Sequence, residues 1–381
     1  MKDVRNKKEQ KSKVKYSINS NYIVGCRFDN WIRLLWQNKF RIKPSYIPKA
    51  LYITLVSFVM FFPAMLEKLI YGSKIRNTEI KNPPVYILGH WRSGTTYLLN
   101  VMSQDKQFAY FDAVSVFTHN NFLLMGKLLR KLLAKSMPDK RPMDNIKYTT
   151  YVPQEELYAY GSQIPECVIH MAAFPHNGDF YRNMAFKKCM TPKQYKRFCK
   201  AYIGICKKLT FAQSGKALLL KSPDNTCRVG VLDEMFPNAK YIHIYRNPYR
   251  VIVSTIGLFK TMFPMFSLQG FPDDEYVENF IIDLYARLYN QYIEDKKYIP
   301  ENRLVEIAYE DFVKDPINIL GDIYKKLEIE GFEEAKPEFE EYIKSLGDYK
   351  TNNFTLSDSL KKKINDNLGF FVDYFGYDRI E

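Results

Sequence analysis

An eight-residue stretch, GHWRSGTT from Gly89 to Thr96, has the composition of a loop that holds an anion. It follows the apolar run Val85–Leu88, which predicts a buried parallel strand, and apolar residues at helical spacing follow it. Backbone N–H groups of such a loop, together with the positive end of the next helix, bind phosphate-like groups. The loop offers the same anion a guanidinium and three hydroxyls around a glycine: Arg92, Ser93, Gly94, Thr95 and Thr96.

The two glycines have the spacing of a nucleotide-binding P-loop, but the expected lysine is missing. Such a loop needs Gly-Lys-Ser/Thr to hold the β- and γ-phosphates and Mg²⁺, whereas Thr95 and Thr96 follow Gly94 here. The cation is Arg92 instead, and a planar guanidinium suits an anion with several oxygens. A plain strand-to-helix turn is the alternative interpretation of this stretch.

A second junction between a strand and a helix lies at residues 241–254. Tyr241–Tyr245 predicts a strand that ends in Arg246, while Asn247 and Pro248 are typical of a helix start. Ser254 follows two helical turns later. Ligands of doubly wound sheets bind at the carboxyl ends of the strands, so we expect Arg246 to face the same crevice as Arg92. A metal-dependent kinase would place a carboxylate at such a strand end.

Together these two motifs resemble those of the sulfotransferases that use 3′-phosphoadenosine 5′-phosphosulfate (PAPS), in the bacterial and Golgi-type form of the phosphosulfate loop. The resemblance covers about residues 83–375. It implies that the residues 92–96 hold the 5′-phosphosulfate and that Arg246 and Ser254 hold the 3′-phosphate. The segment 348–354 resembles the loop that covers the nucleotide in this family, with Lys350 as the contact. The resemblance implies PAPS as co-substrate and no metal.

The catalytic roles follow by analogy with phosphoryl transfer, which depends on positioning and charge stabilisation. Arg92 can neutralise the leaving-group oxygen, and Lys221, at the end of the predicted strand Ala217–Lys221, is expected to contact the phosphosulfate with Ser222. Cytosolic members of the family place their histidine base just after this point, where this chain has none. The bacterial and Golgi-type members use a glutamate, and the stretch from Pro153 resembles the Pro-Gln-Glu element of the bacterial members, so the resemblance implies Glu155, at the start of a predicted helix, as the base. Four alternatives stay open: Glu156, His119, His170 and His176.

The elements alternate between strands and helices, which predicts an α/β, P-loop-like three-layer fold with a central parallel sheet flanked by helices. Further strands are expected at 108–112 and 303–309, and further helices at 116–133, 192–209, 229–236 and 276–298. We assign residues 81–381 to the sulfotransferase domain. The stretch 164–180 mixes Pro, His, Met and aromatic residues and suits either an apolar acceptor pocket or a core-covering loop.

The N-terminal part has two sections. Residues 1–18 form a Lys-rich arm that we predict to be disordered, and residues 19–80 form a helical segment. Its apolar run, Ala50–Leu66 with Pro63 inside, is short for a membrane span. It is interpreted as a buried or lid helix, a membrane-surface helix or a true anchor. The short run and a glycosylation sequon at Asn353 inside the suspected nucleotide loop argue against a Golgi type II protein. The predicted location is cytoplasmic, with membrane-surface contact through 50–66 left open.

Composition narrows the class of protein. The chain has 381 residues, of which 46% are hydrophobic and 26% charged, so it is globular; its net charge is +14. An anionic cofactor accounts for that charge, and no nucleic acid is expected because no reading motif is present. The six cysteines have no zinc spacing and are interpreted as reduced thiols. The expected acceptor is a hydroxyl of a small lipophilic molecule such as a sterol, steroid or lipid alcohol. The alternatives are a carbohydrate acceptor, a nucleotide kinase and a basic membrane- or nucleic-acid-binding module.

Overall fold

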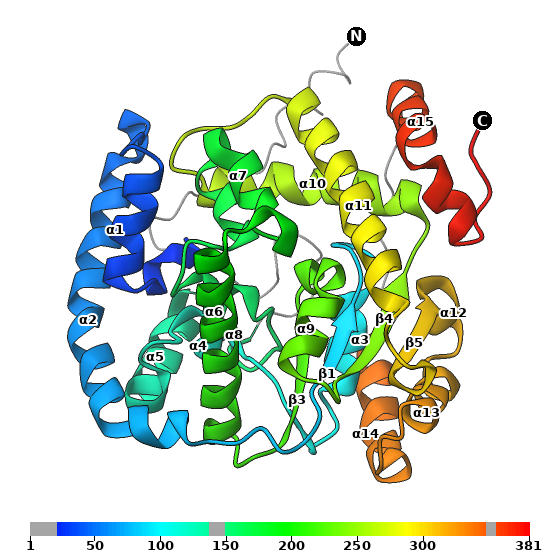
Figure 1. Cartoon of the computed structure of the whole chain (residues 1–381), viewed down its shortest axis with the longest axis horizontal. Coiled ribbons are helices and arrows are strands. Elements are labelled where there is room, and N and C mark those ends of the chain that lie inside the picture. Colours follow the sequence, from blue (N-terminus) through cyan, green and yellow to red (C-terminus); the bar gives the residue numbers. More distant parts are fainter. Residues whose placement is uncertain (1–20, 137–148, 348–355) are drawn as a thin grey trace.

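The protein was analysed as a computed structural model, which describes residues 21–136, 149–347 and 356–381 (Figure 1). Five parallel strands form one sheet in the order β2-β3-β1-β4-β5. The register pairs Val85 with both Leu219 and Lys240, so β1 lies at the centre. The strand bounds are β1 Val85–Leu88, β2 Phe108–Ala109, β3 Ala217–Lys221, β4 Lys240–Tyr245 and β5 Leu304–Ala308.

Helices cover both faces of this sheet, as the alternation within β1 requires. Tyr86 and Leu88 enter a large core, whereas Val85 and Ile87 enter a smaller core on the other face. Helices α1, α8–α11 and α15 contribute to the large core, and α3 and α12–α14 to the small one. The predicted α/β fold with a central parallel sheet is therefore confirmed. The helix bounds are α1 Phe28–Gln37, α2 Ile47–Arg76, α3 Thr95–Met102, α4 Ala113–Phe117, α5 Phe122–Ser136, α6 Leu157–Gly161, α7 Gly178–Asn183, α8 Pro192–Ala212, α9 Val229–Met235, α10 Pro248–Phe266, α11 Asp274–Lys296, α12 Tyr309–Lys314, α13 Pro316–Lys326, α14 Phe332–Ser345 and α15 Asp358–Tyr374.

Several predicted bounds differ from the structure for local reasons. The strand expected at 108–112 ends at Ala109, because Asp112 turns to cap α4 through the N–H of Ser115 at 2.8 Å. The helix expected at 116–133 is divided into α4 and α5. The helix expected from Pro153 begins only at Leu157, which leaves Glu155 on the preceding loop and makes Glu156 the N-cap residue.

The N-terminal helical segment packs against the rest of the chain. The apolar run 50–66 is the middle of the 30-residue helix α2, and Pro63 lies inside this helix without ending it. Its neighbours are α1, α5, α8 and the 3₁₀ turn Tyr22–Gly25. The basic arm predicted at 1–18 lies outside the described residues, and the domain boundary at residue 80 stays a prediction.

Candidate functional site

The loop between β1 and α3 has a backbone that its two glycines make possible. Gly89 and Gly94 have φ of +146° and +107°, in the region that side chains rarely adopt. A Cβ at Gly89 would lie 2.4 Å from the carbonyl oxygen of Ile244, and one at Gly94 would lie 2.3 Å from Cδ2 of Tyr309. Arg92 also has a positive φ, +71°. A left-handed arginine costs about 1–3 kcal/mol, and such strain clusters at functional sites.

Hydrogen bonds within the loop and to buried residues of the domain hold this loop in place. Ser93 Oγ donates to the carbonyl of His90 at 2.8 Å, and the N–H of Gly89 donates to Thr226 Oγ1 at 2.7 Å. The N–H of His90 donates to Tyr289 Oη at 3.3 Å. The His90 ring is buried, which lowers its pKa to about 4 and keeps it neutral at pH 7. No side chain caps α3, so the positive end of that helix faces the loop.

The second junction meets the loop directly, although the two are far apart in the sequence. Arg92 Nε donates to Ser254 Oγ at 2.9 Å, and Arg246 Nη1 lies 3.4 Å from the carbonyl oxygen of Arg92. Asn247 caps α10 by accepting from the N–H of Tyr249 at 3.1 Å, which fixes the start of the helix that carries Ser254. The two predicted motifs therefore form one site at the carboxyl ends of β1 and β4.

Arg246 is positioned by α12 and keeps hydrogen-bonding capacity. Its guanidinium carbon lies 4.2 Å above the centre of the Tyr309 ring, and its Nε lies 4.0 Å from a carboxylate oxygen of Glu310. This Nε is buried and has no hydrogen-bond partner among the residues that the structure describes. A buried N–H without an acceptor is costly unless a ligand satisfies it. The position fits an anion bound between Arg246 and Ser254.

A third group of residues meets the loop from β3. Lys221 Nζ lies 2.5 Å from Glu155 Oε1 and 3.3 Å from Thr96 Oγ1. The Lys221 side chain is almost fully buried, whereas that of Glu155 is 18% exposed. Three groups therefore lie close together here: the carboxylate of Glu155, which solvent can reach, the ammonium of Lys221 and the hydroxyl of Thr96.

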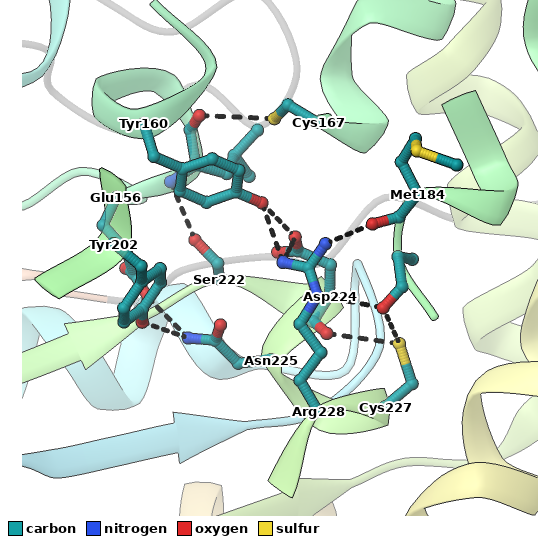
Figure 2. A network of polar contacts seen from close by, with 12 residues as sticks. Glu156, Tyr160, Cys167, Met184, Tyr202, Ser222, Asp224, Asn225, Cys227 and Arg228 are labelled. Atoms are coloured by element: carbon teal, nitrogen blue, oxygen red, sulfur yellow. Dashed lines mark hydrogen bonds and ion pairs between the residues drawn. The ribbon is translucent and has the colours of Figure 1, made fainter. Parts of the chain in front are cut away.

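Glu156 has a different environment from its neighbour (Figure 2). It is fully buried, and it accepts hydrogen bonds from the backbone N–H of Lys221 at 3.0 Å, Asn225 Nδ2 at 2.5 Å and Tyr202 Oη at 2.9 Å. Burial raises its pKa. With its oxygens held inside the protein, Glu156 anchors the end of β3 and is not placed to reach an acceptor.

The rest of this network fixes the turn that follows Lys221. Arg228 Nη1 lies 2.6 Å from Asp224 Oδ2, and its Nη2 donates to the carbonyl of Met184 at 2.7 Å (Figure 2). Tyr160 Oη donates to the same Asp224 oxygen. Ser222 Oγ accepts from the N–H of Leu157 at 3.1 Å, so α6 and the turn are joined beside Glu155. Ser222, which we expected on the phosphosulfate, is buried and engaged here.

The histidine alternatives lie in other surroundings. His119 and His170 are buried, and burial lowers the pKa of each, to about 4 for His170. His119 Nδ1 is 3.0 Å from the carbonyl oxygen of Ser115, and His170 lies between Tyr22 Oη and the carbonyl of Ile164. His176 is exposed on a 3₁₀ turn, Pro175–Asn177. No contact joins any of the three to Arg92, Lys221 or Glu155 in the described part of the chain.

One predicted site residue cannot be placed. Lys350 lies outside the described residues. Among the residues that the structure describes, no group of three His, Cys, Asp or Glu side chains is positioned to hold a metal ion. Sequence reasoning missed the residues that support the site, Thr226, Tyr289, Tyr309 and Glu310. They lie far from both motifs in the chain, and no local pattern distinguishes them.

The sequence has clear relatives. Residues 83–334 match the profile of the sulfotransferase family. The omega-hydroxy-beta-dihydromenaquinone-9 sulfotransferase Stf3 of Mycobacterium bovis is 30% identical over 359 residues, which cover 93% of this chain and 91% of that protein. Stf3 of Mycobacterium tuberculosis matches to the same extent.

Two crystal structures share the fold. Sulfotransferase STF9 from Mycobacterium avium superimposes with a TM-score of 0.68 at 13% identity, over 93% of this chain and 97% of that one. Sulfotransferase STF1 from Mycobacterium tuberculosis H37Rv gives a TM-score of 0.63 at 15% identity, over 90% and 93% of the two chains.

Proposed function

This chain belongs to the sulfotransferase family, and from that premise we propose that it transfers the sulfuryl group of PAPS to a hydroxyl of a small lipophilic acceptor. One observation carries the proposal: the hydrogen bond from Arg92 Nε to Ser254 Oγ joins the two predicted anion motifs into one site. Family membership makes the protein a sulfotransferase and implies PAPS as donor. A kinase and a plain polyanion-binding module are thereby set aside.

The residues present fit a nucleotide with phosphate at both ends. Arg246, whose buried Nε has no hydrogen-bond partner in the described part of the chain, and Ser254 would hold the 3′-phosphate. Arg92, Gly94 and the positive end of α3 would hold the 5′-phosphosulfate. The remaining loop residues, Ser93, Thr95 and Thr96, contribute N–H and hydroxyl groups as the motif implies. Lys350 stays a prediction for the loop over the nucleotide.

The side chains around Lys221 would perform the chemistry. PAPS, when bound, supplies a sulfuryl group on a good leaving group. Glu155, on a loop and reachable from solvent, would accept the proton of the acceptor hydroxyl. Lys221 lies between Glu155 and Thr96, and Arg92 lies on the same loop. Both cations would stabilise negative charge as it develops on the transferred group and the leaving oxygen.

The apolar surroundings of α10 support a lipophilic acceptor. A cavity of about 10 Å³, which leaves room for about one water molecule, is lined by the apolar side chains of Met171, Phe259, Phe263 and Phe280, among others, so it marks an apolar surface and not a finished acceptor site. Phe259 is the first residue of α10 that lines this pocket. It lies about 7–8 Å along the helix from Ser254, at 1.5 Å per residue. The segment 164–180 supplies one wall, and most of that segment is buried in the core. The relative Stf3 is named for a lipid acceptor that carries a terminal hydroxyl.

Replacing Glu155 by glutamine tests the assignment of the base. Glutamine keeps the shape of the side chain but cannot accept the proton, so kcat with PAPS and a terminally hydroxylated isoprenoid such as farnesol should fall about 10²–10⁴-fold. Binding of 3′,5′-bisphosphoadenosine should stay near the wild-type value.

The exposed Glu301→Gln is the matched control and should keep full activity. Near-normal turnover of Glu155→Gln would refute Glu155 as the base and return attention to His176, the exposed alternative.

A further inference from the structure

Helix α2 presents an apolar face that nothing in the described structure covers. It forms the outer edge of the molecule, remote from α15 (Figure 1). Side chains along this face recur every three or four residues and are 47–74% exposed. Each is large and apolar, and they run over almost the whole helix: Leu51, Leu55, Phe58, Phe62, Met65 and Leu69. Soluble proteins rarely leave so long a stripe open to water, which marks it as an interaction surface.

The opposite face of α2 is fixed to the domain by a buried ion pair. Glu67 is 2% exposed, and its carboxylate pairs with Lys208 of α8. Its second oxygen accepts from the N–H of Leu124, at the start of α5, at 2.9 Å. Removing α2 from this place would leave Lys208 buried without its carboxylate, which is strongly unfavourable.

Because its inner face is attached to the domain, α2 is limited in how it could contact a membrane. By length and composition, Pro44–Arg76 is apolar enough to cross a bilayer, and only 17% of its most apolar window is buried. A crossing helix would lose the contacts with α1, α5 and α8 and break the ion pair of Glu67 with the buried Lys208. A helix that keeps those contacts can offer only its outer face, so it would lie along the surface of the bilayer.

The exposed charges around the stripe are mostly basic. Between residues 39 and 78, Glu67 is the single acidic residue, and it is buried. Helix α5, which packs beside α2, has exposed leucines at 124, 128 and 132, and none of its residues 122–136 is acidic. Six exposed side chains near the two ends of α2 are basic, Lys39, Arg41, Lys43, Lys68, Lys74 and Arg76, and one exposed side chain beyond its C-terminal end, Glu79, is acidic.

We propose that the outer face of α2 docks on the surface of an anionic phospholipid bilayer, with the helix in the plane of the interface. The apolar stripe would enter the boundary between headgroups and acyl chains, and the flanking cations would bind anionic headgroups. A second copy of the chain fits this face less well, since two-fold pairing would bring like charges together. The proposal goes beyond sulfuryl transfer and does not depend on it.

Docking in this way has a consequence for the acceptor. The start of α2 touches the end of α10, because Lys49 Nζ donates to the carbonyl of Met265. Phe263, two residues before Met265 on α10, lines the apolar pocket. A docked α2 would therefore keep that pocket close to the lipid phase, where a lipophilic alcohol is dissolved.

Flotation of the full-length protein with preformed vesicles tests the proposal. The wild type should float with vesicles of phosphatidylcholine and phosphatidylglycerol, and bind pure phosphatidylcholine much more weakly. The double variant Leu55→Glu/Phe62→Glu should lose at least about tenfold in vesicle affinity, because two large apolar side chains no longer enter the interface. Phe370→Glu on α15, with a similar exposure of 59%, is the matched control and should bind like the wild type.

The cations are tested separately. Replacing Lys68, Lys74 and Arg76 by glutamine should weaken binding to anionic vesicles about fivefold per residue at physiological salt. Equal binding by wild type and Leu55→Glu/Phe62→Glu would overturn the proposal. So would a stable dimer that the same double variant dissociates, with no vesicle binding by the wild type.

The orientation of α2 can be measured with probes at its two ends. Leu55→Cys and Leu69→Cys lie about 21 Å apart along the helix, and each can carry a polarity-sensitive fluorophore once the partly exposed Cys189 and Cys199 are serines. Depth-dependent quenchers in the lipid should place both probes at the same shallow depth. One probe near the bilayer centre and the other near a surface would show a spanning helix and overturn the in-plane proposal.

Discussion

Arg246 gives the sharpest test of how the nucleotide is held. Replacing it by alanine removes a guanidinium whose side chain is 19% exposed. Its buried Nε has no hydrogen-bond partner within residues 21–136, 149–347 and 356–381. Within the protein it contacts the Tyr309 ring, a Glu310 oxygen at 4.0 Å and the carbonyl of Arg92 at 3.4 Å. These contacts are weak, so the variant should lose only about 1 kcal/mol of unfolding free energy.

Arg246→Ala should lose much more free energy of nucleotide binding than free energy of unfolding. A hydrogen bond to a charged group contributes about 1.5–3 kcal/mol, and a guanidinium can donate two to one phosphate. The total of about 3–6 kcal/mol corresponds to a loss of roughly 10²–10⁴-fold in affinity, and partial exposure favours the lower end. The loss should concern only ligands that carry the 3′-phosphate.

Calorimetric titration with two nucleotides isolates this effect. Wild type should bind 3′,5′-bisphosphoadenosine more tightly than adenosine 5′-monophosphate, and Arg246→Ala should remove that preference without changing the affinity for the monophosphate. The matched control is Arg250→Ala, an exposed arginine on the first turn of the same helix, which should keep the preference. If Arg246→Ala lowered the affinity for both nucleotides equally, or for neither, the assignment of the 3′-phosphate position would be wrong.

Two predictions concern stability, and both can be measured by urea unfolding. Glu67→Gln should destabilise the protein by about 3–5 kcal/mol, because Lys208 stays buried without its ion partner; a loss below about 1 kcal/mol would show that the pair does not hold α2 in place. The pKa of His90 and of His170 is lowered by burial to about 4, so the unfolded state takes up protons first as pH falls. The contribution of the two neutral histidines to the free energy of unfolding is fully present above about pH 6.5. It is lost as pH falls toward 4, with a slope of up to about 1.4 kcal/mol per pH unit for each histidine. His170→Gln should flatten this dependence between pH 7 and pH 5, and an unchanged slope would contradict it.

The sequence predicted the parts of the site that depend on local pattern. The run Val85–Leu88, the loop to Thr96 and the junction at Arg246 are short segments whose residue types determine strand, turn and helix start. The rule that parallel strands bring their carboxyl ends together then placed Arg92 near Arg246. The contact of Arg92 with Ser254, 162 residues away, follows from that arrangement but could not be assigned to particular atoms.

Other features depend on tertiary packing and had no local signal. Glu155 and Glu156 are adjacent and chemically identical, yet one pairs with Lys221 near the surface and the other is buried between Tyr202 and Asn225. The two glutamates differ only in how they lie relative to β3 and α8, which carry Lys221 and Tyr202. The apolar run 50–66 indicated a helix but not its bounds, since the residues that extend α2 to Ile47 and to Arg76 are held by contacts with the domain.

The central claim is that this site transfers sulfuryl from PAPS to a lipophilic alcohol. The most direct measurement follows sulfur-35 from labelled PAPS into farnesol or cholesterol, with a simple sugar as the competing acceptor and Arg92→Ala as the inactive control. We expect labelled product in the organic phase, a higher kcat/KM for the lipophilic alcohol than for the sugar, and no transfer by the Arg92 variant. Preferential sulfation of the sugar, or transfer that survives the loss of Arg92, would contradict the account.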